Sequence, residues 1–154
     1  MRMRLESAKL SPAAYHAMRG LESFVSKSSN LELSLLELVK MRASQINGCA
    51  FSIDVHSKHA RANGETEQRL YALSAWRGAT FFTDRERAAL AWTEALTLIA
   101  EGLPPDDVYT EVRNEFDEEE LVNLSLAVIT INAWNRLAIG LRKIPGEYLP
   151  NKVA

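Results

Sequence analysis

Apolar residues recur at steps of three and four along almost the whole chain, and this period is typical of amphipathic α-helices. Asn-Gly pairs and single glycines divide the pattern into segments of helical length. No segment shows the alternation of apolar and polar residues that a half-buried strand requires. The sequence therefore predicts an all-α fold, a compact bundle of about seven helices that forms one domain over residues 1–154.

The expected helix boundaries follow from local stop and start patterns. Ser11-Pro12 is typical of an N-cap followed by a first-turn proline, and Thr83–Glu86 and 117–120 have the pattern of capping boxes. The first helix begins at Ser11-Pro12, and the others cover about 33–46, 49–63, 66–76, 83–99, 108–116 and a long stretch from 117–120 to about 140. The tail, 142–154, contains two prolines and is expected to be irregular.

The long last helix is apolar on nearly all sides, so it must be buried on nearly all sides. A place at the bundle centre or at a subunit interface satisfies this need, and we expect a homo-oligomer. Its charge-free stretch, 121–135, has 15 residues. Since a bilayer span needs about 20 apolar residues, no membrane helix is expected.

Composition excludes several classes of function. The net charge is −2 and the charges of both signs are interspersed, so no basic stripe indicates binding to nucleic acid. A single cysteine cannot form an intramolecular disulfide, and the first residues lack an apolar signal core. We therefore expect a cytoplasmic protein.

That single cysteine, Cys49, follows Asn47-Gly48 and is predicted to lie on the first turn of a helix. Backbone N–H groups and the helix dipole at this position favour the thiolate, which is the nucleophilic form. Ser52 and His56 follow at i+3 and i+7, so thiol, hydroxyl and imidazole are expected to share one helix face. The alternative is that Cys49 is only a small buried hydrophobic residue.

Glu37 stands twelve residues before Cys49, and His56 follows seven residues after it. With this spacing, the chain from about residue 14 to residue 139 resembles the AhpD-like alkylhydroperoxidases of the carboxymuconolactone decarboxylase superfamily. The strings that carry the resemblance are Arg42–Phe51, Asp54–His56, Gly64–Glu67, Arg85–Trp92 and Ile131–Ala138.

The resemblance implies an all-helical fold, assembly into trimers or hexamers, and a Cys-x-x-Cys pair assisted by a glutamate and a histidine. Such proteins reduce alkyl hydroperoxides, and an external thiol partner resets the disulfide. Carried onto this chain, the glutamate is Glu37, the first cysteine is Cys49 and the histidine is His56. The second cysteine is replaced by Ser52.

The serine at this position changes the expected chemistry, because a hydroxyl cannot form a disulfide or resolve a sulfenic acid. If position 52 is the attacking position, Ser52 removes the attacking group. If Cys49 attacks, the chain works as a one-cysteine peroxidase that needs an external thiol. We expect an antioxidant peroxidase of this kind, in which Cys49 is the thiol and His56 and Glu37 handle protons.

Three alternatives remain open from the sequence. In the first alternative, the chain is a catalytically silent, oligomeric or ligand-binding member of the superfamily. In the second, it is a carboxymuconolactone-decarboxylase-like enzyme that uses His56 and Glu37 as acid and base without sulfur. In the third alternative, His56 and His59 bind a metal together with Asp54 or Glu37. Because an i, i+3 histidine pair without a clear third ligand is a weak pattern, we expect no metal and no cofactor.

Overall fold

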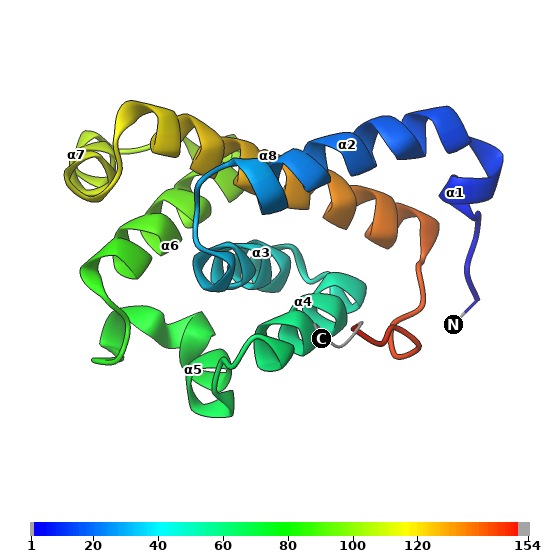
Figure 1. Ribbon diagram of the computed structural model, residues 1–154, viewed down its shortest axis with the longest axis horizontal. Coiled ribbons are helices and arrows are strands. Elements are labelled where there is room, and N and C mark those ends of the chain that lie inside the picture. The colour runs from blue at the N-terminus through cyan, green and yellow to red at the C-terminus, as the bar shows by residue number, and fades with distance from the viewer. Residues whose placement is uncertain (1, 151–154) are drawn as a thin grey trace.

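The helices of this chain are arranged around one central helix, α3, as the computed structural model of residues 2–150 shows (Figure 1). The described residues form eight α-helices and two short 3-10 helices, without strands, so the predicted all-α class is confirmed. The elements are α1 (Ser7–Leu10), α2 (Pro12–Ser28), α3 (Leu33–Asn47), α4 (Ala50–Ala62), α5 (Glu67–Ala72), η1 (Leu73–Gly78), α6 (Asp84–Thr97), η2 (Ile99–Glu101), α7 (Asp106–Glu115) and α8 (Glu118–Leu141).

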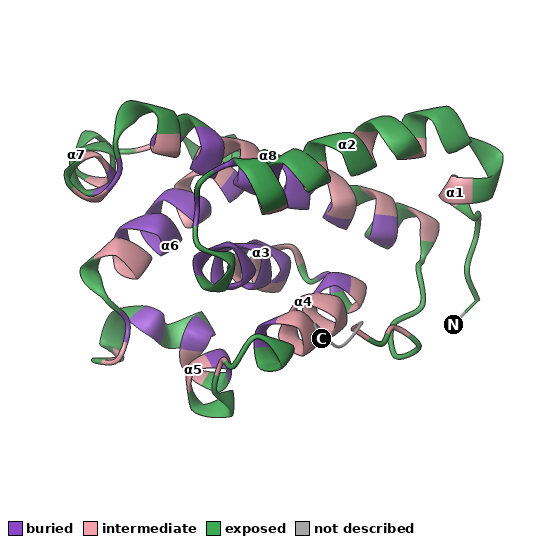
Figure 2. Ribbon diagram, viewed as in Figure 1, coloured by how far each residue is buried: buried purple, intermediate pink, exposed green. Residues whose placement is uncertain are grey.

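Helix α3 packs against α4, α6 and α8, and it is buried on nearly every side (Figure 2). Leu36, Leu38 and Val39 are completely inaccessible to solvent, which removes their apolar surface from water. The same helix buries two charged residues, Glu37 and Lys40. Buried charges need partners close by, so the centre of the fold also positions a polar site.

Helix α8 is the second core helix. The helix is long and apolar enough to cross a membrane by length and composition alone, although its charge-free stretch was expected to be too short for this. The helix packs instead against α2, α3 and α6. Leu124, Val128 and Ile131 are buried there, while Val122 and Ile129 remain exposed on its other side. This pattern is that of a core helix with one apolar face left uncovered.

Local sequence patterns predicted most helix ends correctly. Both capping boxes form, at Thr83–Glu86 and at Asp117–Glu120. Gly48 ends α3 in the left-handed conformation, with φ of 66°, and this turn leads directly into α4. Because the turn is tight, α3 and α4 lie side by side, which brings their facing side chains together.

The structure corrects the prediction at three places. A short helix, α1, precedes Pro12, where none was expected. The helix predicted over 66–76 is divided into α5 and η1, with a non-helical φ of −119° at Ala75. The helix predicted over 83–99 ends at Thr97. The tail is irregular from Lys143 to Pro150, and the rest of it, 151–154, lies outside the described residues.

Candidate active site

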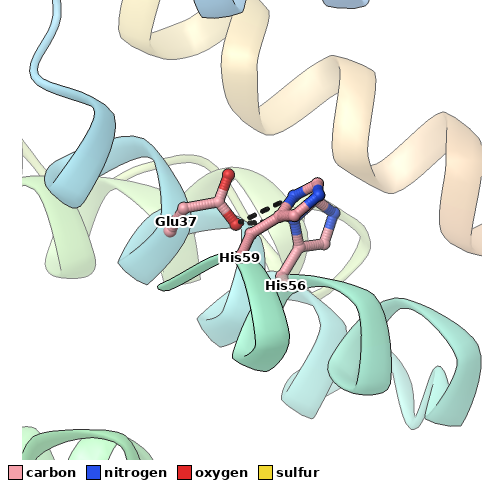
Figure 3. A group of neighbouring side chains, drawn as sticks. All are labelled: Glu37, His56 and His59. Carbon is pink, nitrogen blue, oxygen red and sulfur yellow. Dashed lines mark hydrogen bonds and ion pairs between the residues drawn. The ribbon is translucent and has the colours of Figure 1, made fainter. Parts of the chain in front are cut away.

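The candidate site lies between α3 and α4, where Glu37 faces two histidines. Glu37 points from α3 toward His56 and His59 of α4, as Figure 3 shows. The Oε2 atom of Glu37 is 2.8 Å from Nδ1 of His56 and 3.9 Å from Nδ1 of His59. Sequence reasoning paired Glu37 with His56 for proton handling and named His59 only in the metal alternative. The structure brings all three residues together.

Glu37 is only 6% exposed, yet its pKa is lowered, which favours the ionised carboxylate. Burial alone would raise the pKa of Glu37, but the hydrogen bond from His56 and the positive charge of Lys40 hold it below its ordinary value. When a carboxylate accepts a hydrogen bond from Nδ1–H of an imidazole, it fixes the tautomer and the orientation of the imidazole ring. In that tautomer, Nε2 of His56 is the ring nitrogen that can accept a proton.

A partly buried ion pair lies next to this arrangement. The Nζ atom of Lys40 lies 2.6 Å from Oε1 of Glu22 and 3.8 Å from Oε1 of Glu37. Burial would raise the pKa of Glu22, but Lys40 keeps it below its ordinary value. The three residues together carry one net negative charge. Sequence reasoning missed Glu22 and Lys40, because their contact joins α2 to α3 and no local pattern specifies it.

Cys49 is the N-cap residue of α4, one residue before the first turn on which it was expected. Its side chain is buried, with 1% exposure. The Cys49 thiol donates a hydrogen bond to the hydroxyl oxygen of Ser52 over 3.2 Å. Thiol and hydroxyl are therefore adjacent, as their spacing predicted.

Ser52, His56 and His59 line a cavity of about 430 Å³, whereas Cys49 lies behind Ser52 and is not part of its wall. The expected common face of thiol, hydroxyl and imidazole is therefore divided, and the hydroxyl is the group presented to the cavity. Much of the remaining wall is apolar, with Trp134 and Leu137 of α8 among its residues. A cavity of this size and character suits a small organic molecule.

Two cations line the same cavity, Arg19 and Lys143. Within residues 2–150, neither of them forms an ion pair with a carboxylate. Partial burial and the neighbouring charge of Arg19 lower the pKa of Lys143, whose Nζ lies 4.1 Å from the centre of the Phe51 ring. The wall also contains two carboxylates, Glu6 and Glu22, and each of these is paired with a lysine. Positive charge on Arg19 and Lys143 is therefore left without a carboxylate partner among the described residues.

The C-terminal segment is attached to α4 and contributes Tyr148 to the cavity. The Tyr148 hydroxyl forms a short hydrogen bond with Nε2 of His59, and Lys58 donates to the Tyr148 carbonyl over 2.9 Å. Asp54 pairs with Lys58 and accepts from the Gly146 N–H, so Glu37, and not Asp54, accompanies the two histidines. Sequence reasoning missed Tyr148, because nothing local relates residue 148 to residue 59.

The profile of the Carboxymuconolactone decarboxylase family matches residues 12–95, which is more than half of the chain. The chain belongs to the carboxymuconolactone decarboxylase family. The uncharacterized family relative YdfG of Bacillus subtilis is 42% identical over 141 residues, which cover 92% of this chain and 95% of YdfG. The resemblance to AhpD-like proteins, stated from the sequence, is confirmed at the level of the superfamily.

Solved structures agree with this assignment. A protein of unknown function from Agrobacterium tumefaciens, described as a candidate AhpD antioxidant defence protein, has a TM-score of 0.91 and 43% identity, with 96% of this chain and 100% of that one covered. The debrominase Bmp8 has a TM-score of 0.78 at 17% identity, with 90% and 74% covered. At that identity Bmp8 shows the shared fold alone.

Proposed function

We propose that this family member is an acid–base enzyme that moves a proton on a small organic acid, with His56 as the base and Glu37 as its orienting carboxylate. The observation that carries the proposal is the 2.8 Å contact between Glu37 and His56 at the wall of the cavity. It supports the reading in which imidazole and carboxylate act without sulfur. The sequence left this acid–base alternative open.

The proposed step is proton transfer from a carbon atom next to a carbonyl group. Nε2 of His56 takes the proton, and the electron pair of the broken C–H bond moves to the carbonyl oxygen. The hydroxyl of Ser52 is one helical turn away on the same wall and supplies a hydrogen bond to the developing charge. The imidazolium then returns its proton to the substrate at carbon, so that atoms and charge balance.

The remainder of the cavity indicates the class of substrate. Arg19 and Lys143 provide positive charge for a carboxylate, and the apolar wall suits a cyclic or branched carbon skeleton. A lactone or a 2-oxo acid with one free carboxylate satisfies both requirements. The family's description as carboxymuconolactone decarboxylases is consistent with this class.

Hydrogen–deuterium exchange tests the proposal without requiring a complete reaction. A panel of γ-lactone carboxylates and 2-oxo acids is incubated with the protein in D2O, and loss of the carbon-bound proton is followed by proton NMR. We expect exchange with the wild type, a loss of about 100-fold or more in His56→Ala and Glu37→Gln, and retained exchange in Cys49→Ala. A panel with no exchange, or exchange that depends on Cys49, contradicts the proposal.

A second candidate function is the peroxidase expected from the sequence. It is favoured by the contact of the Cys49 thiol with Ser52 and by the Agrobacterium relative described above. The Cys49 thiolate would attack the O–O bond of an organic hydroperoxide, giving a sulfenic acid and an alcohol once the alkoxide takes a proton from His56. Two molecules of an external thiol then restore Cys49, with release of water and a disulfide.

Peroxide consumption separates the two candidates. With cumene hydroperoxide and dithiothreitol, the peroxidase predicts turnover in the wild type that Cys49→Ala abolishes. The acid–base enzyme predicts no such turnover, because the thiol lies behind Ser52. Absence of both peroxide turnover and proton exchange would favour the third reading, a silent binding member of the family.

A further inference from the structure

We propose that Glu37, His56 and His59 form a site for one divalent transition-metal ion, of which Zn²⁺ is the best match. The three side chains converge from α3 and α4 (Figure 3). The sequence offered this grouping only as a weak alternative, because nothing in it decided between Asp54 and Glu37 as the third donor. Binding of the ion is independent of the acid–base function proposed above.

The donor atoms are close to the separations that a metal requires. One donor atom from each of the three residues can be chosen so that all lie within 4.8 Å of one another. Metal–donor bonds of about 2.0–2.2 Å in a tetrahedral site place neighbouring donors roughly 3.3 Å apart. The distances from Glu37 Oε2 to Nδ1 of His56, 2.8 Å, and of His59, 3.9 Å, lie on either side of that value. Small side-chain rotations therefore complete the site.

Outer contacts already hold two of the three donors in place. Tyr148 hydrogen-bonds Nε2 of His59, which leaves Nδ1 of that ring to face Glu37. Lys40 lies 3.8 Å from Oε1 of Glu37, which leaves Oε2 for the metal. Metal-binding residues are typically oriented by such second partners, and these partners contribute to affinity.

The charge next to the three donors and the access from the cavity also suit a divalent cation, although Arg19 and Lys143 line the same cavity. Glu22, Glu37 and Lys40 together carry one net negative charge, and neutral imidazoles add none. His56 and His59 line the cavity, so water or a ligand can reach a fourth coordination position from that side. Two imidazoles and one carboxylate suit Zn²⁺ and related ions, whereas Mg²⁺ prefers oxygen donors and retains its water.

A bound metal ion and the hydrogen bond between Glu37 and His56 cannot be present at the same time. Both use Oε2 of Glu37 and Nδ1 of His56. The metal-bound protein therefore lacks the oriented imidazole base. This consequence rests on the proposed function, and it predicts that Zn²⁺ suppresses proton exchange. The binding of the ion does not depend on it.

Calorimetric titration of the protein without a histidine tag tests the site directly. We expect one Zn²⁺ per chain, absorption bands of a nitrogen- and oxygen-ligated ion with Co²⁺, and no binding of Mg²⁺. His59→Ala removes one donor but keeps the Glu37–His56 pair, and it should weaken Zn²⁺ binding by more than the roughly 10–100-fold that loss of an outer partner costs. His16→Ala is the matched control, since His16 is the remaining histidine and is exposed on α2.

Tyr148→Phe provides a second variant that keeps all three donors. It should weaken binding about tenfold through loss of the hydrogen bond to His59. Sub-stoichiometric binding, unchanged affinity in His59→Ala, equal losses in His16→Ala, or a thiolate-to-Co²⁺ band would each overturn the site. Because no substrate is present in these titrations, failure of the acid–base function leaves their outcome unaffected.

Discussion

At the scale of single residues, the oxygen atom of Ser52 has the largest consequence for the chemistry of this site. The sequence predicted that a hydroxyl here ends two-thiol chemistry, but it left open which of positions 49 and 52 is the attacking position. The structure places Ser52 on the cavity wall and Cys49 behind it, with 1% exposure. The choice depended on side-chain direction at the start of α4, which residue spacing does not determine.

Ser52→Cys is expected to restore a two-thiol site. The Cys49 sulfur lies 3.2 Å from the Ser52 oxygen, so a shift of about 1 Å brings two sulfurs to the disulfide distance of about 2.05 Å. We expect consumption of cumene hydroperoxide with dithiothreitol and a loss of both free thiols on oxidation, measured by thiol titration.

Ser57→Cys is the control for this experiment, because it adds a thiol to the same helix outside the cavity that Ser52 lines. Ser57→Cys should show neither peroxide consumption nor a loss of free thiols on oxidation. Equal turnover in both variants would mean that an accessible thiol alone is responsible, and that the environment of position 52 contributes nothing.

At the scale of elements, the turn at Gly48 determines how the site is assembled. Asn47-Gly48 predicted the end of α3 correctly, and from it the approach of Glu37 to His56 follows. Residues that reach the site from distant elements were not predictable, because neither α2 nor the C-terminal segment has a local pattern that specifies its docking. Glu22 and Tyr148 are the two examples.

Gly48→Ala should destabilise the protein by about 1 kcal/mol or more, since Gly48 has a φ of 66° and an added Cβ is strained there. Gly20→Ala is the matched control in the interior of α2, where it should stabilise by about 0.5–1 kcal/mol. An added Cβ meets no atom within 4 Å at either position, so only backbone conformation distinguishes them. Urea unfolding measures both, and changes of the same sign would contradict this explanation.

Glu94 joins α6 to α3 and η1, and its ionisation is expected to make stability depend on pH. Burial would raise the pKa of Glu94, but hydrogen bonds from Trp76, Arg77 and Arg42 hold it below its ordinary value of 4.5. The ionised carboxylate therefore stabilises the fold above that pH, and the contribution is lost as pH falls through the lowered pKa of the folded state.

Glu94→Gln should accordingly reduce the free energy of unfolding by about 2 kcal/mol at pH 7. The difference from the wild type should become smaller at pH 3, because the unfolded state takes up a proton at Glu94 below about pH 4.5 and the advantage of the ionised group falls from there. Urea unfolding at pH 7 and pH 3 provides the comparison. Glu101→Gln, which changes an exposed residue of η2, should leave the free energy of unfolding unchanged at both pH values. A difference that is the same at both pH values would assign the effect to packing.

At the scale of the whole molecule, α8 explains why a homo-oligomer is expected. One side of α8 forms the core, while Val122 and Ile129, seven residues apart, are 60% and 54% exposed. Residues at this spacing share a helix face, and a continuous apolar face is uncommon on the surface of a monomer. The AhpD-like resemblance implies assembly into trimers or hexamers, and this stays a prediction. We expect the exposed face of α8 to lie in the interface between the chains.

Light scattering coupled to size-exclusion chromatography tests this by giving the mass of the particle in solution. We expect a mass of three or six chains for the wild type, and monomers for the double variant Val122→Glu, Ile129→Glu, because burying two carboxylates without partners costs several kcal/mol. Leu103→Glu is the matched control, since Leu103 is 89% exposed in the connector before α7. Its mass should equal that of the wild type. If the wild type is a monomer, the exposed face of α8 has another cause, whereas an intact oligomer in the double variant would place the interface on a different surface.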